Sequence, residues 1–415
     1  MLIKNKNFLL LLFGRILTNI ADSIYYIASM WLVYDLGGSA FYSGIAGFLT
    51  SLPWAFQFLT GPLVDRWKVK KILVVSQIAQ AIILLIIPVL YHFDALTIQL
   101  VLVLMPLLSI IQQFVYPAQS KVLPFVVKKE QLVKANASFS IAYQGIDFIF
   151  NAISGVLVAI VGAIMLFTVN SIFFTVAAML FALLKLPKTE HPTSESFTKV
   201  SLSSYWTELK EGFQIIFQSL MALFILGAIA MNFAIGGAMA LLPAFADNRG
   251  GPELYGYYLA AMSVGGLAGA LLAPKLANVK LGSFYIISYI IAPIAWVACV
   301  SISSNIWSIL LFTIVWIPVG ASNVIVPSMI QSAVPTGLLG RVNSVSVSMS
   351  NMIMPLGSLI SGYLALQMET NTVMIILGAL LFFEAVLWFS HPKLRNMPVV
   401  SQIDNNVLQF PSSEK

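Results

Sequence analysis

Apolar runs about twenty residues long, separated by short polar intervals, repeat along most of the 415-residue chain. A helix needs about 20 mostly apolar residues to cross the hydrocarbon core of a bilayer. Only 9% of the residues are charged, whereas about a quarter are charged in an ordinary soluble domain. We therefore expect an integral membrane protein whose spans are all α-helical.

Twelve such runs are found, six on each side of a polar interval. The first six cover residues 8–34, 41–60, 72–91, 96–115, 136–161 and 164–185. The last six cover residues 219–245, 256–274, 283–303, 307–329, 344–367 and 372–390. The pattern predicts an all-α membrane fold with twelve transmembrane helices in two six-helix bundles. We expect four parts: the bundles at residues 1–185 and 219–391, a cytoplasmic linker at 186–218 and a cytoplasmic tail at 392–415.

The basic residues agree with this count. If both termini are cytoplasmic, 20 of the 22 Lys and Arg residues fall in cytoplasmic segments, as the positive-inside rule requires. The bases therefore set the topology, and no nucleic-acid partner is needed to explain them. The linker ends in an amphipathic stretch, residues 205–217, which we expect to lie along the membrane surface. The tail after Pro392 is expected to be disordered.

The two halves of the sequence resemble each other. A shift of 213 residues without gaps pairs Gly14 with Gly227 and Asn19 with Asn232. Internal repeats of this kind are common in secondary transporters. One register that aligns glycines and asparagines together predicts that the two bundles are pseudo-symmetric.

Three acids lie inside predicted spans, namely Asp22, Asp147 and Glu384. An ionised carboxylate at the bilayer centre costs about 2.5 kcal/mol or more. Such a group therefore faces the bundle interior, pairs with another group or holds a proton. Glu384 has no polar residues spaced around it, and we expect it to be protonated or packed.

Two of these acids are the centres of polar stripes at helical spacing. The stripe in the first span consists of Arg15, Asn19, Asp22, Tyr26 and Ser29. The stripe in the fifth span consists of Ser140, Gln144, Asp147, Asn151 and Ser154. Either stripe could line a shared hydrated cavity or join neighbouring helices through hydrogen bonds, and both explanations stay open for the Ser and Asn residues.

For the aspartates a functional role is favoured, because joining helices rarely requires a carboxylate. Asp147 is the first candidate for proton coupling, since its stripe contains no base, and Asp22 is the second. The predicted substrate cavity consists of Arg15, Asn19, Tyr26, Gln144, Asn151 and Asn232.

Residues of the kind that carry enzyme chemistry are sparse. The three histidines lie apart, near span ends or in loops, and the single cysteine, Cys299, lies within an apolar run where we expect a core residue. The sequence has no catalytic triad, no metal-spaced group and no phosphate-binding glycine loop. An enzyme, ATP-driven transport, a cofactor and a metal site are therefore not expected.

The stretch GPLVDRWKVKK, Gly61–Lys71, resembles the loop after the second helix of major facilitator superfamily transporters, G-x-L-x-D-R-x-G-R-K/R. Gly61, Asp65, Arg66 and Lys70 fit the pattern, as does the leucine at position 63. One branch of this superfamily holds macrolide-efflux proteins and enterobactin exporters. The present chain resembles that branch in residues 116–137, 209–217 and 339–365 and in the neighbourhood of Asp22.

The resemblance implies two six-helix domains around a central cavity that opens alternately to each side, with Gly61, Asp65, Arg66 and Lys70 forming a gating loop. It implies a proton-coupled exporter of a small amphiphilic compound, such as a drug, an antibiotic or a siderophore-like molecule, in a bacterial cytoplasmic membrane. The expected partners are this small molecule, protons and the lipid bilayer, and a monomer is expected. A proton-coupled uptake symporter, a lipid flippase and a non-transporting receptor of the same fold remain alternatives.

Overall fold

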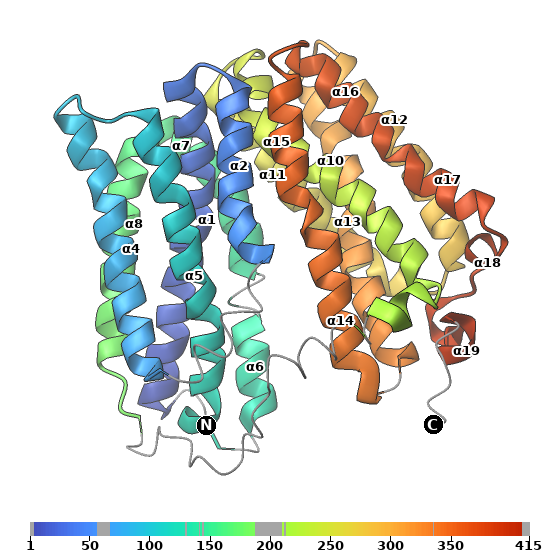
Figure 1. Cartoon of the computed structure of the whole chain (residues 1–415), viewed down its shortest axis with the longest axis horizontal. Helices are drawn as coiled ribbons and strands as arrows, with labels where there is room; N and C mark the ends of the chain where they lie inside the picture. The colour runs from blue at the N-terminus through green and yellow to red at the C-terminus, as the bar shows by residue number, and fades with distance from the viewer. Residues whose placement is uncertain are drawn as a thin grey trace. The chain divides into compact units, whose positions relative to one another are not determined.

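The structure is a computed structural model of the whole chain. It describes residues 4–55, 67–128, 131–140, 142, 145–186, 210, 213–334 and 336–408. These residues are helical apart from short turns and contain no strand. They pack into two compact units (Figure 1). The first unit holds the described residues of Met1–Ser196 and Pro243–Ala260, and the second holds those of Phe197–Leu242 and Ala261–Lys415.

The N-terminal half contains the helices α1 (Lys6–Gly37), α2 (Ala40–Ala55), α4 (Val69–His92), α5 (Ile98–Val126), α6 (Leu132–Ser140), α7 (Ile146–Val161) and α8 (Ala163–Ala182). The C-terminal half contains α10 (Met221–Asp247), α11 (Pro252–Leu276), α12 (Leu281–Ser301), α13 (Asn305–Ala333), α14 (Thr336–Asn351), α15 (Ile353–Leu364), α16 (Thr370–Leu380) and α17 (Phe382–Ser390). Three short elements follow, α18 (Pro392–Arg395), η5 (Val400–Gln402) and α19 (Asn405–Leu408).

Over its described residues, each of the twelve predicted spans corresponds to one helix or to two successive helices. The fifth span is built from α6 and α7, the eleventh from α14 and α15, and the twelfth from α16 and α17. Among the described residues, nine helical stretches are individually long and apolar enough to cross a membrane. The prediction of an all-helical membrane fold is confirmed.

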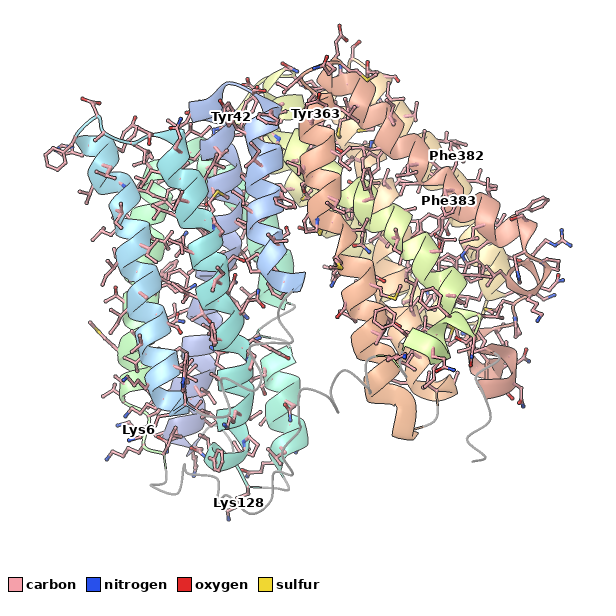
Figure 2. All side chains as sticks on the ribbon, in the orientation of Figure 1. Lys6, Tyr42, Lys128, Tyr363, Phe382 and Phe383 are labelled. Carbon is pink, nitrogen blue, oxygen red and sulfur yellow. The ribbon has the colours of Figure 1, made fainter. Side chains whose placement is uncertain are left out.

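The ends of α1 show how local sequence sets a helix. The Oδ1 of Asn5 accepts a hydrogen bond from the Phe8 backbone N–H at 3.1 Å, which caps the first turn. At the other end, Gly38 adopts a φ of 63°, a left-handed conformation that glycine reaches without steric cost. Figure 2 shows Lys6, at the start of α1, and Lys128 at one end of the first unit, with Tyr42 at the opposite end.

The helix α5 runs well beyond the predicted end of its span at residue 115. Its last turns stay helical because Val122, Leu123 and Val126 are buried in a core that also contains residues of α1, α4 and α8. The predicted boundary was wrong here, because a proline and a lysine after residue 115 look like the start of a loop. Prolines inside membrane helices are tolerated when neighbouring groups satisfy the freed backbone.

The tail is also not as predicted, since it is folded through Leu408. Leu394, Met397 and Leu408 are buried in the core of the second unit. Two tail carbonyls accept backbone hydrogen bonds at the starts of membrane helices, Pro398 from Leu281 at 3.1 Å and Leu408 from Leu220 at 2.9 Å. A few apolar residues within a polar segment were sufficient to dock it. Of the amphipathic stretch 205–217, only residues 213–217 form a described helical turn.

The glycines paired by the internal repeat have corresponding places in the two units. A Cβ added to Gly14 on α1 would overlap the ring of Phe181 on α8. A Cβ added to Gly227 on α10 would overlap the carboxyl of Glu384 on α17. In each unit, therefore, a glycine on the first helix allows a large side chain of the last helix to approach closely, which agrees with the predicted pseudo-symmetry.

Candidate functional site

A cavity of about 450 Å³ lies within the first unit, between α1, α2 and α5. Ligand pockets usually measure about 300–1,000 Å³. The lining residues are Arg15, Thr18, Asn19, Asp22, Ser23, Tyr25, Tyr26, Thr50, Ser51, Trp54, Ser109, Gln112, Gln113, Val115 and Tyr116. The wall thus combines one base, one acid, amides, hydroxyls and aromatic rings, a mixture that suits a small amphiphilic ligand.

The polar stripe of α1 forms one side of this cavity. Arg15, Asn19, Asp22 and Tyr26 all border it, as the helical spacing predicts. Arg15 and Asn19 are buried, while Asp22 and Tyr26 are partly exposed. Ser29, the last residue of the stripe, is fully buried and is not among the lining residues.

Arg15 is held in place by α5. Its guanidinium donates a hydrogen bond to the Gln119 side-chain oxygen, and it lies over the ring of Tyr116 at 4.5 Å from the ring centre. Arg15 therefore has a cation–π contact as well as a charge-assisted hydrogen bond. These contacts orient a buried positive charge at the edge of the cavity.

Asn19 joins α1 to the fifth span. Its Nδ2 donates a hydrogen bond to the Ala142 carbonyl at 3.0 Å. Ala142 is a π-helical residue between α6 and α7, and its carbonyl accepts this bond from another helix. Asn19 therefore joins two helices through a hydrogen bond, and it also borders the cavity.

Sequence reasoning missed the contribution of α5. Gln112 and Tyr116 line the cavity and Gln119 binds Arg15, at the same helical spacing as the stripe of α1. The Ser109 hydroxyl donates to the Thr50 carbonyl at 2.6 Å and joins α5 to α2. The predicted end of the span at residue 115 divided this stripe, so its periodicity was not recognised.

Gln113 has the least satisfied side chain of this wall. It is 4% exposed, and neither its Nε2 nor its Oε1 has a hydrogen-bond partner in the described part of the protein. A buried amide without partners costs about 1–3 kcal/mol per group. Both amide atoms are closed to solvent, so the side chain would have to turn toward the cavity to contact a polar group of a ligand.

The other predicted site residues are not brought to this cavity by described side chains. Asn232 lies on α10 in the second unit and donates to the Ala228 carbonyl of its own helix at 2.9 Å. Asp147 and Asn151 belong to α7, but their side chains lie outside what the structure describes. Gln144 lies outside the described residues altogether.

Of the predicted gating loop, only Lys70 is described. Its Nζ donates a hydrogen bond to the Leu184 carbonyl at 2.7 Å and thereby joins the start of α4 to the end of α8. Gly61, Asp65 and Arg66 lie outside the described residues. The gating role of the loop therefore stays a prediction.

Glu384 is packed, as one of the two expectations for it requires. It is 6% exposed, and its Oε1 accepts a hydrogen bond from the Trp388 indole N–H at 3.0 Å. Trp388 stacks in turn on Tyr285, with ring centres 4.1 Å apart. The predicted core position of Cys299 is confirmed, since its side chain is fully buried.

Residues 2–414 match the family described as transmembrane secretion effector, a branch of the major facilitator superfamily. The chain belongs to the major facilitator superfamily. This superfamily transporter is 24% identical over 408 residues to the multidrug efflux pump Tap of Mycolicibacterium fortuitum, an alignment that covers 96% of this chain and 99% of that protein. It is also 24% identical over 391 residues to macrolide efflux protein A of Streptococcus pyogenes, covering 90% and 93% of the two chains.

Solved structures confirm the major facilitator fold. The nucleoside transporter NupG superposes with a TM-score of 0.69 at 12% identity, covering 92% of this chain and 98% of that chain. A bacterial homologue of the human lysosomal transporter Spinster superposes with a TM-score of 0.68 at 14% identity, covering 92% and 96%. The resemblance seen in the sequence is confirmed, and the protein is a multi-pass membrane transporter and not an enzyme.

Proposed function

We propose that this major facilitator transporter exports a small amphiphilic compound, such as a drug, an antibiotic or a siderophore-like molecule, from a bacterial cytoplasm. The protein is a monomer with both termini in the cytoplasm, and it works by alternating access. Protons that move inward drive the export. The similarity to a multidrug efflux pump and to a macrolide efflux protein supports the direction and the class of cargo.

The composition of the cavity is the observation that carries this proposal. Asp22 shares the cavity with the amide of Gln113, which has no hydrogen-bond partner among the described residues, and with the rings of Tyr26, Trp54 and Tyr116. The rings provide apolar area for the body of the cargo, and the amide provides the directional hydrogen bonds that set its orientation. Arg15, which is fixed by α5, favours cargo with an acceptor at that end.

Asp22 provides a direct way to couple export to protons. A carboxylate can hold either a proton or a polar group of the cargo, and binding of one then weakens binding of the other by the same factor. Such competition within a cavity that opens to one side at a time exchanges cargo for protons. Asp147, on α7, is the other coupling residue of the proposal and the first candidate from the sequence, because its stripe contains no base.

Substrate-induced proton movement in reconstituted vesicles tests this function. Purified protein is reconstituted around a pH-sensitive dye, and a macrolide or a lipophilic dye such as ethidium is added under a pH gradient of either sign. Asp22→Asn and Asp147→Asn should each abolish cargo-linked proton movement while the protein remains folded. Asp35→Asn, which removes an exposed acid from the end of the same helix α1, should behave as the unchanged protein.

The result also separates the alternatives. Proton-linked transport that persists undiminished in both Asp22→Asn and Asp147→Asn would remove these residues from the mechanism. Cargo and protons moving in the same direction would identify an uptake symporter. Cargo binding without any linked proton movement, in either gradient, would favour a flippase or a receptor.

A further inference from the structure

One face of α4 is exposed and apolar along the helix. Its residues Val75, Ile78, Ile82, Leu85 and Val89 are 45–59% exposed and follow one another at intervals of three and four residues. This spacing places them in one line along the helix. In a transmembrane helix, an exposed apolar line of this kind faces the lipid chains.

Two lysines continue this line past the end of the apolar part. Lys71 lies on α4 four residues before Val75, and Lys68 is the N-cap residue that directly precedes α4; both are exposed. The start of α4 lies at the end of the unit where α1 begins, because Lys70 binds the Leu184 carbonyl and Asn7 binds the neighbouring Lys185 carbonyl. This end carries Lys6 and Lys128 (Figure 2), and the positive-inside rule assigns it to the cytoplasmic surface.

The two lysines stand at the mouth of a groove between α4 and α5, which run side by side in Figure 1. The groove has a volume of about 640 Å³. It is lined by Trp67, Lys68, Lys71, Ile72, Val75, Ser76, Ala79, Ile110, Ile111 and Phe114. None of these described lining residues is acidic. Trp67 stacks on Phe114, with ring centres 5.9 Å apart and planes 20° apart, and lines the mouth of the groove.

We propose that this groove binds an anionic phospholipid of the cytoplasmic leaflet. The phosphate and its anionic headgroup lie between the ammonium groups of Lys68 and Lys71, while one acyl chain follows the apolar groove past Val75 and Ala79. Tryptophan is enriched at the level of lipid headgroups, which is the position of Trp67. Lysine side chains extend their charged ends toward this level from a lipid-facing helix.

Three features distinguish this site from a general attraction of basic residues to the membrane. The lysines continue the lipid-facing line, so the headgroup and the chain of one molecule can be bound together. The groove provides a defined place for that chain. The aromatic pair is already formed within the protein, so binding does not have to order these side chains. The site is separate from the cavity between α1, α2 and α5.

Lipid binding to the purified full chain in detergent tests the proposal without any transport measurement. Native mass spectrometry gives the affinity for dioleoylphosphatidylglycerol and for dioleoylphosphatidylcholine, which has the same chains and no net charge. Lys68→Gln with Lys71→Gln should weaken binding of the anionic lipid about 30-fold, since each base near a charged headgroup contributes a factor of about five. Binding of the neutral lipid should change little.

Two further variants separate the groove from charge alone. Lys128→Gln with Lys134→Gln removes the same charge from exposed positions that do not line the groove, and should keep the affinity of the unchanged protein. Ala79→Phe fills the groove while both of its lysines remain, and should weaken both lipids. The proposal would be overturned if Lys68→Gln with Lys71→Gln left the phosphatidylglycerol affinity unchanged, or if Lys128→Gln with Lys134→Gln reduced it equally. Displacement of the lipid by inorganic phosphate would also overturn it.

Discussion

Replacing Gln113 by leucine separates ligand binding from stability in the cavity of the first unit. Gln113 is 4% exposed, and both of its amide atoms lack hydrogen-bond partners in the described part of the protein. Gln113→Leu keeps the apolar bulk of the side chain and removes these two atoms. In most proteins a change from a buried polar residue would be expected to cost stability, and here we expect the opposite or no effect.

The magnitudes follow from the hydrogen bonds that are lost. Each buried polar group without a partner costs about 1–3 kcal/mol, so removing the amide should leave the free energy of unfolding unchanged or raise it by an amount in that range. One neutral hydrogen bond to the cargo contributes about 0.5–1.5 kcal/mol. Cargo binding should therefore weaken by roughly 2- to 13-fold.

The assay combines two measurements on the same preparation. The KM for transport of a macrolide in vesicles reports binding, and tryptophan fluorescence during heating in detergent reports unfolding. Ser109→Ala is the matched control on the same helix, because its hydroxyl donates to the Thr50 carbonyl at 2.6 Å. That variant should lower stability by about 0.5–1.5 kcal/mol.

The reasoning would be refuted by the reverse pattern. If Gln113→Leu lowers the unfolding temperature as Ser109→Ala does and leaves the KM unchanged, the amide holds helices together. A rise in KM at constant or increased stability assigns the amide to the cargo, because a residue that only packs cannot produce this combination.

Four further substitutions test the packing and the predicted gate. Gly227→Ala should destabilise the protein by about 1–3 kcal/mol, because its new Cβ would overlap the Glu384 carboxyl. In thermal unfolding, the double variant with Glu384→Ala should lose less stability than the sum of the two single losses. A strictly additive loss would argue against contact between Gly227 and Glu384. Gly155→Ala should lower the unfolding temperature at least as much, since its Cβ would overlap the backbone of Gly256, and an unchanged temperature would contradict that crossing. If residues 61–71 form a gate, Asp65→Asn should strongly reduce export in vesicles with little loss of folded protein, whereas near-normal transport would leave the loop only its role in orientation.

The two polar stripes of the cavity show how far helical periodicity reaches. Four of the five residues of the α1 stripe, Arg15, Asn19, Asp22 and Tyr26, border the cavity. The stripe of α5 has the same spacing and was missed, because its span was predicted to end before Tyr116. Pattern recognition is reliable inside a helix and fails when the end of that helix is set by packing.

The folded tail also shows that tertiary packing can override what local composition predicts. Its composition is polar enough to predict disorder, but Leu394 and Leu408 find places in the core of the second unit. The free energy that orders the segment comes from apolar surface on α10, α12, α13 and α17. Local composition contains no information about that surface.

The sequence by itself determined the membrane class, the number of spans, the family and the face of α1 that is polar. The family was indicated by the resemblance of Gly61–Lys71 and other segments to known transporters. The other three follow from hydropathy, charge placement or the 3.6-residue period, which are properties of neighbouring residues. Only the tertiary structure decided that Arg15 is held by Gln119, that Asn19 binds the Ala142 carbonyl and that Gln113 has no partner within the described ranges. These pairings depend on how separate helices cross, and the crossing is set by the packing of many side chains together.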